Sequence, residues 1–154
     1  MKKLSMLIGL LSVANVSKVK DVKGELATDM VLEECYVSSY QELVDALVFV
    51  ESSGNPLAHN VKSGAVGCLQ ILPIMVREVN RILDLTGGDR TFQLEDRWDC
   101  DKSKQMFDIW ADYHHCYNSY EHIARNWNGG PKGITKSATE EYWERVKKYL
   151  SSNE

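Results

Sequence analysis

Residues 39–58 read SYQELVDALVFVESSGNPLA, and they carry the clearest structural signal in the chain. Ser39 is a favourable N-cap for a helix, and Glu42 three residues later completes a capping box. Spacings of three and four place one set of residues on a single helix face: Leu43, Val44, Leu47, Val48 and Glu51. Gly54 tolerates a left-handed turn and Pro56 cannot continue a helix. The stretch therefore predicts an amphipathic helix that ends just before Gly54.

Glu51 is the last member of this buried stripe. Burial among apolar groups disfavours a charged carboxylate and raises its pKa, which is what a general acid near neutral pH requires. No other Asp or Glu occurs from Ser52 through Arg77. We interpret Glu51 as a proton-transfer group that acts alone. The alternative is a helix-end glutamate that points into water, which is the commoner arrangement for a lone Glu.

The composition of the chain is that of an ordinary globular protein. Its 154 residues suffice for one domain with a core, and 44% of them are hydrophobic and 26% charged. The net charge of -4 argues against a nucleic-acid-binding protein, because phosphate binding needs a basic surface. It also argues against strong attraction to anionic membranes.

The first residues have the pattern of an export signal. Lys2 and Lys3 precede the apolar run 4–11, and residues 12–14 offer small side chains at the cleavage position. The run is too short to span a bilayer. We expect residues 1–14 to be a signal peptide and the protein to reach the periplasm or cell envelope. The alternative is a short amphipathic helix that stays in the protein.

The rest of the chain divides into a weakly patterned lead-in, residues 15–37, and a folded domain, residues 38–154. Helical patterns dominate the domain, and residues 59–72 suit a small β-hairpin. Further helices are expected to begin at Pro73, at Asp96 or Asp99, at Ser119 and at Ser137. We therefore predict a mainly α fold, a single compact helical domain.

The four cysteines are Cys35, Cys68, Cys100 and Cys116, and they form no CxxC pair or zinc-ligand spacing. Cys68 lies in an apolar stretch and is predicted to be a small core residue. Export would permit a disulfide, with Cys100 and Cys116 as the candidate pair, although the sequence does not establish it. His114 and His115 precede Cys116, but adjacent helical residues face different directions, so no metal site is expected.

Three short segments of the chain differ from ordinary loops. These are ESSGNPLA at 51–58, SGAVGCLQILP at 63–73 and ARNWNGGP at 124–131. Gly64 and Gly67 allow close backbone approach, and Gln70 places an amide among apolar neighbours. Trp127 and Asn128 offer an aromatic face and an amide, which together suit a sugar ring. Taken alone, the last four residues of the third segment could equally be a plain turn.

Together the segments resemble the soluble lytic transglycosylase family, which has a goose-lysozyme-like helical fold. The family's patterns are E-S-x-x-N-P-x-A, G-A-x-G-L-M-Q and Y-N-A-G-P. All three occur here in the family's order, and the resemblance covers roughly residues 39–150. It implies an α+β lysozyme-like domain around a glycan cleft. The implied activity is cleavage of the β-1,4 bond between N-acetylmuramic acid and N-acetylglucosamine in peptidoglycan.

The resemblance also implies roles for single residues. Glu51 matches the family's catalytic acid/base, and Ser53 matches a serine placed near that acid. Gln70 and Asn128 match amides that line the glycan cleft. Tyr142 is similar to a late family tyrosine near the acid, and we expect both Ser53 and Tyr142 to contact substrate as well.

The chain departs from the family pattern at Cys68, where an apolar residue is usual, and at Gly129, where Ala is usual. Trp127 stands where the family has Tyr. It removes a hydroxyl donor and adds an indole N–H, and we expect it to contact substrate.

The implied mechanism needs one acid, no metal and no cofactor. Hydrolytic glycosidases usually use two carboxylates, yet residues 52–77 and 122–139 contain none. In a lytic transglycosylase the muramoyl 6-hydroxyl is the nucleophile, and Glu51 first donates and then retrieves a proton. The product carries a 1,6-anhydro end. The expected partner is the peptidoglycan strand, and the protein is expected to be a monomer. Its setting could be wall remodelling, secretion or conjugation machinery, or a phage particle.

Two alternatives stay open. A hydrolytic lysozyme on the same fold would need a second carboxylate, which could come from Asp84, Asp89, Glu95, Asp96 or Asp99. A non-catalytic glycan-binding or assembly protein would keep the cleft without the chemistry. The products formed from purified peptidoglycan would separate these alternatives.

Overall fold

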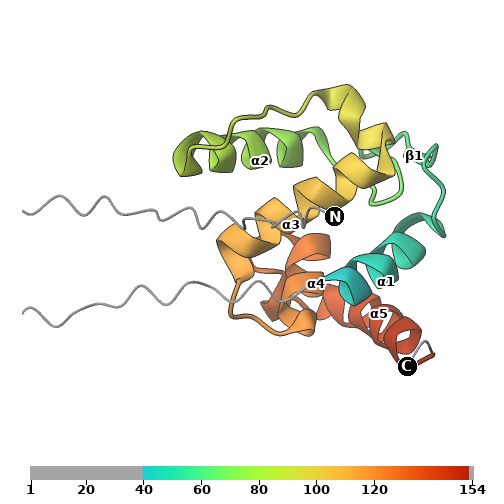
Figure 1. The fold of residues 1–154 in the computed structure, drawn as a ribbon. Helices are drawn as coiled ribbons and strands as arrows, with labels where there is room; N and C mark the ends of the chain where they lie inside the picture. Colours follow the sequence, from blue (N-terminus) through green and yellow to red (C-terminus); the bar gives the residue numbers. More distant parts are fainter. Residues whose placement is uncertain (1–39, 153–154) are drawn as a thin grey trace, which may run out of the picture. The chain divides into compact units, whose positions relative to one another are not determined.

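The computed structural model describes residues 40–152, which form five α-helices, three short 3₁₀ helices and a two-stranded sheet (Figure 1). In chain order these are α1 (Gln41–Ser52), β1 (His59–Asn60), β2 (Ala65–Val66), α2 (Pro73–Thr86), η1 (Leu94–Trp98), α3 (Cys100–His115), α4 (Tyr120–Gly129), η2 (Gly133–Thr135), η3 (Ser137–Thr139) and α5 (Glu140–Ser152). The predicted mainly α fold is confirmed. The proposed signal peptide and lead-in, residues 1–14 and 15–37, lie outside the described residues, as do Cys35 and Ser39.

Helix α1 begins and ends slightly differently from the prediction. Tyr40, not Ser39, holds the N-cap position, and its side chain makes no capping hydrogen bond. At the other end Ser53 itself adopts the left-handed conformation, with φ 55°, and Gly54 follows with φ 80°. The N–H groups of these two residues donate to the carbonyls of Phe49 and Val48 and close the last turn.

The predicted hairpin is present. Strands β1 and β2 pair antiparallel, with His59 opposite Val66 and Asn60 opposite Ala65. Val66 also pairs with Ile71, which brings the loop between them back onto the sheet.

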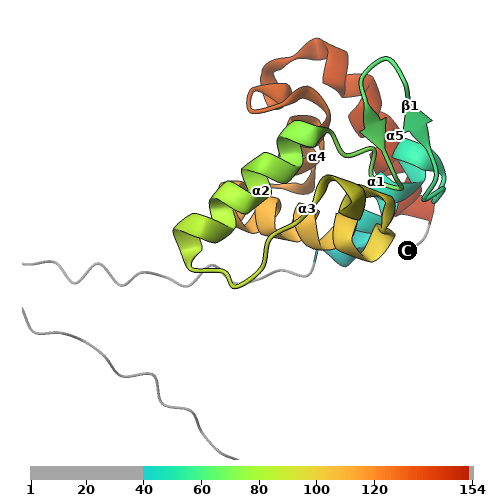
Figure 2. The same cartoon turned by 90° about the horizontal axis from the view of Figure 1, so that it is seen from above.

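The core lies where α1, α4 and α5 meet α3. Figures 1 and 2 show α1 beside α5 and α2 beside α3. Fully buried side chains from five segments fill the space between them: Leu43, Leu47, Leu69, Met106, Phe107, Ile123 and Val146. None of the helices within residues 40–152 is both long and apolar enough to cross a bilayer.

Several helix starts agree with the local signals. Pro73 is the first residue of α2, Asp99 caps α3 by accepting from Asp101 and Lys102, and Ser119 caps α4 by accepting from His122. Asp96 does not start α3; its carboxylate accepts from the backbone of Gln93 within η1 instead.

The start of the last helix differs from the prediction. Ser137 opens the 3₁₀ turn η3 and caps nothing, and α5 begins at Glu140. Contacts with other segments set this later start. The hydroxyl of Thr139 is hydrogen-bonded to the carbonyls of Gly133 and Lys136 and accepts from buried Arg125.

The disulfide prediction was wrong. Cys68 pairs with Cys100, and Cys116 is free. Cys100 and Cys116 stand at opposite ends of α3, so the helix rise separates them by about 24 Å, far beyond disulfide reach. Gly67 makes the observed pairing possible: its φ is 79°, and a Cβ there would collide with the carbonyl oxygen of Arg97.

Candidate active site

A groove of about 930 Å³ is lined by the end of α1, the loop after β2, and helices α2, α3 and α4. It brings together four of the residues singled out in the sequence, namely Glu51, Gln70, Trp127 and Asn128. These residues come from three segments far apart in the chain, so their convergence is a property of the fold. Ser53 and Tyr142 do not line the groove.

Glu51 stands half-buried in the last turn of α1 and faces the groove. Burial raises the pKa of its carboxyl above the ordinary value. A hydrogen bond from the Tyr142 hydroxyl and the nearby charge of Arg145 act in the opposite direction and offset part of this rise. The carboxyl is therefore placed to hold a proton at a higher pH than an exposed glutamate does.

Tyr142 reaches Glu51 from α5. Its hydroxyl donates to Oε1 of Glu51 at 2.7 Å, and its side chain is 3% exposed. Burial, followed by the charge of Glu51, raises the pKa of Tyr142 well above its usual value, so the phenol stays a neutral donor. The guanidinium of Arg145 lies 5.6 Å from the centre of the tyrosine ring. Tyr142 therefore contacts the acid, whereas the sequence suggested contact with substrate as well.

Gln70 has an unusual backbone for a residue with a side chain, with φ 47°. A left-handed conformation costs a non-glycine residue about 1–2 kcal/mol. The side-chain amide nitrogen donates to the carbonyls of Gly67 at 3.0 Å and Ala58 at 3.2 Å. Because both N–H bonds are used within the loop, the side-chain oxygen of Gln70 is the atom left to accept from a ligand.

Trp127 and Asn128 stand in the last turn of α4. The half-buried indole of Trp127 packs against Phe107 and Trp110, with ring centroids 5.1 and 5.2 Å apart. Packing against these two rings fixes the indole at the wall of the groove. Asn128 is exposed and presents a free-standing amide at the same wall.

Side chains of α4 hold the turn after Asn128 in place through hydrogen bonds. Buried Arg125 donates to the hydroxyl of Thr139 and the carbonyl of Lys136, and Asn126 accepts from the backbone of Ile134. Sequence reasoning missed both residues, because an arginine and an asparagine beside a turn are ordinarily solvent-exposed.

Ser53 was singled out from the sequence, but Ser52, directly after the acid, is the serine that makes a structural contact. Ser53 is exposed, whereas the hydroxyl of Ser52 donates to the carbonyl of Cys68 at 2.8 Å. The signal was available, because the quoted pattern E-S-x-x-N-P places the serine directly after the acid. Ser52 therefore connects the acid's helix to the loop that carries Gln70.

The groove continues between α2 and α4 to a histidine-rich end that the sequence did not indicate. His114 binds Glu78 across the helices at 2.8 Å, and Nδ1 of His115 lies 2.8 Å from the amide nitrogen of Asn118. Burial, followed by the charges of His122 and His114, lowers the pKa of His115 to about 4, so this imidazole is neutral at pH 7. Across residues 40–152, no group of three or more His, Cys, Asp or Glu side chains is arranged to hold a metal ion.

A second acid, Glu78, also lines the groove. Hydrogen bonds from Arg81 first, and then from His114, lower the pKa of Glu78 to about 2 despite partial burial. Glu78 is thus ionised at neutral pH, while Glu51 has the raised pKa. Five other acids were considered for a second catalytic role, and none of them lines this groove: Asp84, Asp89, Glu95, Asp96 and Asp99.

No protein-family model, curated protein or solved structure matches this chain. The functional assignment therefore rests on the chemistry of the groove and on the three motifs that converge in it.

Proposed function

We propose that this protein is a lytic transglycosylase that cleaves the glycan strands of peptidoglycan. The observation that carries the proposal is Glu51, an acid with a raised pKa in a groove lined by amides and indoles. The groove's volume lies in the range of small-molecule sites, which is about 300–1,000 Å³. Its wall combines what a sugar needs: apolar faces for stacking and amides for the hydroxyl and acetamido groups.

In the first step the protonated carboxyl of Glu51 donates its proton to the glycosidic oxygen between N-acetylmuramic acid and N-acetylglucosamine. The bond from C1 to that oxygen breaks, and the leaving sugar departs with a hydroxyl. The Glu51 carboxylate that results is stabilised by the hydrogen bond from Tyr142. Such acid assistance typically contributes about a hundred- to ten-thousand-fold in rate.

In the second step the carboxylate of Glu51 takes the proton from the muramoyl 6-hydroxyl as that oxygen bonds to C1. A 1,6-anhydro ring forms, Glu51 is protonated again, and no water is consumed. The acid and the base are the same residue at different moments, which agrees with a single carboxyl of raised pKa in the groove.

Hydrolysis by a lysozyme-type mechanism is the second candidate, and Glu78 is the observation that favours it. Glu78 is ionised and lines the same groove, so it is chemically able to activate water. Its hydrogen bonds to Arg81 and His114 argue against this role, because they occupy both of its oxygens. The contact between Tyr142 and Glu51 favours a catalytic protein over a non-catalytic glycan-binding one, because it adjusts the pKa of an acid that faces the groove.

The disulfide of this protein agrees with a substrate that lies in an oxidising compartment. The Cys68–Cys100 disulfide is the kind of bond that persists outside the reducing cytosol. It supports export to the periplasm or cell envelope, where peptidoglycan lies.

The proposal is tested by digesting purified peptidoglycan and identifying the new ends by mass spectrometry. Anhydromuramoyl ends are expected from the wild type and none from Glu51→Gln. Reducing ends would establish the hydrolase instead, and binding without cleavage would establish the non-catalytic alternative.

A further inference from the structure

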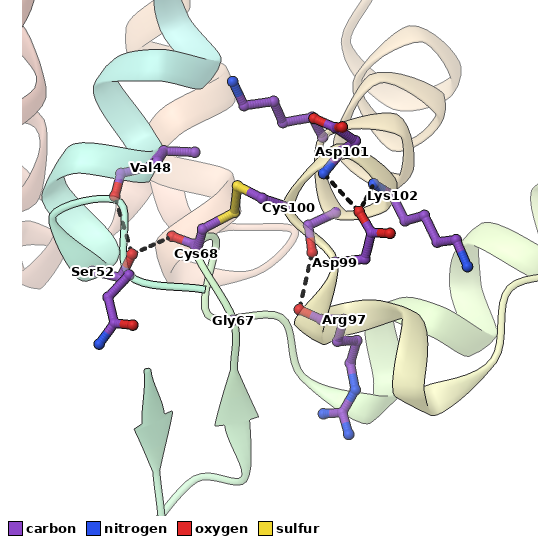
Figure 3. Close-up of a disulfide and its surroundings, with 12 residues drawn as sticks. Val48, Ser52, Gly67, Cys68, Arg97, Asp99, Cys100, Asp101 and Lys102 are labelled. Atoms are coloured by element: carbon purple, nitrogen blue, oxygen red, sulfur yellow. Dashed lines mark hydrogen bonds between the residues drawn. A yellow bond between two sulfur atoms is a disulfide. The ribbon is translucent and has the colours of Figure 1, made fainter. Parts of the chain in front are cut away.

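Ser52 joins the helix that carries the acid to the loop that carries the amide. Its hydroxyl donates to the carbonyl of Cys68 at 2.8 Å, and Cys68 is bonded through its sulfur to Cys100 at the start of α3. Figure 3 shows Ser52 beside the carbonyl of Cys68, with the disulfide leading on to Cys100. Glu51 directly precedes Ser52, and Gln70 comes two residues after Cys68. The disulfide thus connects the loop, and through Ser52 the helix that carries the acid, to the start of α3.

The loop has a conformation that needs such support. Gln70 has φ 47°, in a region that residues with side chains rarely adopt, and its neighbours Leu69 and Ile71 are buried. A backbone of this kind persists only where the surrounding structure determines it. If the support were removed, Gln70 would relax toward a right-handed or extended backbone, and its side-chain oxygen would leave the groove wall.

Other contacts hold the two ends of the loop, and Gln70 is bonded within it to Ala58 and Gly67. Buried Arg97 donates to the carbonyls of Gly64 and Ile71, each at 3.1 Å, and these residues flank the loop. Between them, Cys68 is the residue with bonds to both α1 and α3. The Ser52 hydroxyl and the disulfide are therefore the contacts that fix residue 68 relative to both α1 and α3.

We propose that the Cys68–Cys100 disulfide and the Ser52 hydroxyl are positioning elements that hold Gln70 at a fixed place relative to Glu51, so that glycan binding depends on the oxidation state of this bond. The inference rests on the proposed function, because it assigns Gln70 to substrate. The disulfide acts on binding, while the proton transfer by Glu51 is supported separately from α5 through Tyr142.

The first experiment compares oxidised and reduced full-length protein on soluble peptidoglycan strands. Dithiothreitol supplies two electrons and two protons, giving two thiols while the reagent forms its own disulfide. Reduction is expected to raise KM about five- to tenfold, the effect of one lost hydrogen bond to sugar, and to change kcat less than about twofold. Circular dichroism checks that the reduced protein is folded. Cys116→Ser is the matched control, since its thiol is free, and it should respond to reduction as the wild type does.

The second experiment separates positioning from general stabilisation. Ser52→Ala should raise KM in the oxidised protein, and Ser52→Thr should restore it, because threonine keeps the hydroxyl. Combining Ser52→Ala with Cys100→Ser should raise KM little more than either change alone, since both act on the same loop. Independent, multiplying effects would overturn the proposal. Ser52→Ala keeps the disulfide, so this arm decides the question even if reduction unfolds the protein.

A third measurement needs no catalysis. Reduction should speed amide hydrogen exchange about tenfold or more in residues 68–71 and leave α5 unchanged. Absence of anhydro ends from the oxidised wild type would overturn the proposed function. Anhydro ends formed with the same KM in both oxidation states, with unchanged exchange in the loop, would overturn this inference alone.

Discussion

The hydroxyl of Tyr142 donates a 2.7 Å hydrogen bond to Glu51, although the two residues are 91 positions apart in the chain. The bond opposes the effect of burial. Burial favours the protonated carboxyl, and the tyrosine favours the carboxylate. An acid that must give up a proton and then take one back needs both influences, because its two protonation states must lie close in free energy.

The first prediction is that Tyr142→Phe shifts the alkaline limb of the pH–activity profile upward. Phenylalanine keeps the ring but removes the donor, so the Glu51 carboxylate loses a stabilising bond and its pKa rises further. The profile of kcat/KM against pH measures the shift. Tyr149→Phe, on the same helix but with its ring on Phe49, is the control and should leave the limb in place. A downward shift in Tyr142→Phe would contradict this account of Glu51.

The second prediction is that Glu51→Gln reduces cleavage at least about a hundredfold and leaves glycan binding nearly unchanged. The amide keeps the shape of the side chain but neither donates nor retrieves the proton. The wild type should lose activity as pH rises through the raised pKa of Glu51, because the first step needs the protonated form. Product release from purified peptidoglycan measures cleavage, and calorimetry measures binding. Retention of more than a few per cent of activity would rule out the single-acid mechanism.

Some features of the fold and of the groove were predictable because their signals are local in the sequence. The position of Glu51 at the end of the apolar stripe was predictable from one helix alone, because its spacing from Leu47 and Val44 is local information. The helix starts at Pro73, Asp99 and Ser119 were predictable for the same reason.

The misses share a cause of the opposite kind. The partner of Cys68, the buried Arg97 and Arg125, and the 3₁₀ turn at Ser137 all depend on segments that meet only in the folded chain. A buried arginine has no local signature, since its pattern is that of a surface residue. The pairing of Cys100 with Cys116 was avoidable, because the predicted helix between them already separates the two thiols too widely.

The third prediction concerns the two amides of the groove. Asn128→Ala should weaken glycan binding by about 0.5–1.5 kcal/mol, the worth of one neutral hydrogen bond. Gln70→Ala should weaken it more, because it also frees the carbonyls of Gly67 and Ala58 that the amide holds. Titration of each variant with soluble glycan strands measures the loss. Wild-type binding in both variants would mean that the glycan lies elsewhere.

The fourth prediction separates transglycosylation from hydrolysis. Glu78→Gln should retain activity within about threefold of the wild type and still yield anhydro ends, because Glu78 has no chemical role in the proposed mechanism. Its bonds to Arg81 and His114 should weaken, with only a small effect on stability since the side chains of both pairs are partly exposed to solvent. Mass spectrometry of the products is the measurement. If Glu78→Gln were as inactive as Glu51→Gln while still folded, a second catalytic carboxylate would exist and the hydrolytic mechanism would replace ours.

The last prediction concerns the pH dependence of stability, which two groups on α3 influence in opposite directions. The pKa of His115 is lowered from 6.5 to about 4, mainly by burial. Between those values the unfolded chain binds a proton that the folded chain does not, so this residue makes stability rise with pH. The pKa of Asp108 is raised from 3.8 to about 6, by burial first and then by the charge of Asp112. Here the folded chain binds the extra proton, so stability falls as pH rises.

Between about pH 4 and 6 the two contributions should partly cancel. Each amounts to at most about 1.4 kcal/mol per pH unit, and that of Asp108 is the smaller because this residue is exposed and solvent screens its charge. Asp108→Asn should therefore make the free energy of unfolding rise more steeply with pH across this window, and His115→Gln should make it rise less steeply or fall. Urea denaturation of the wild type and both variants at half-unit intervals of pH measures these slopes. The double variant should have a slope between those of the two single variants. Slopes that change in the same direction in the two single variants would show that burial does not set these two pKa values in the way the structure indicates.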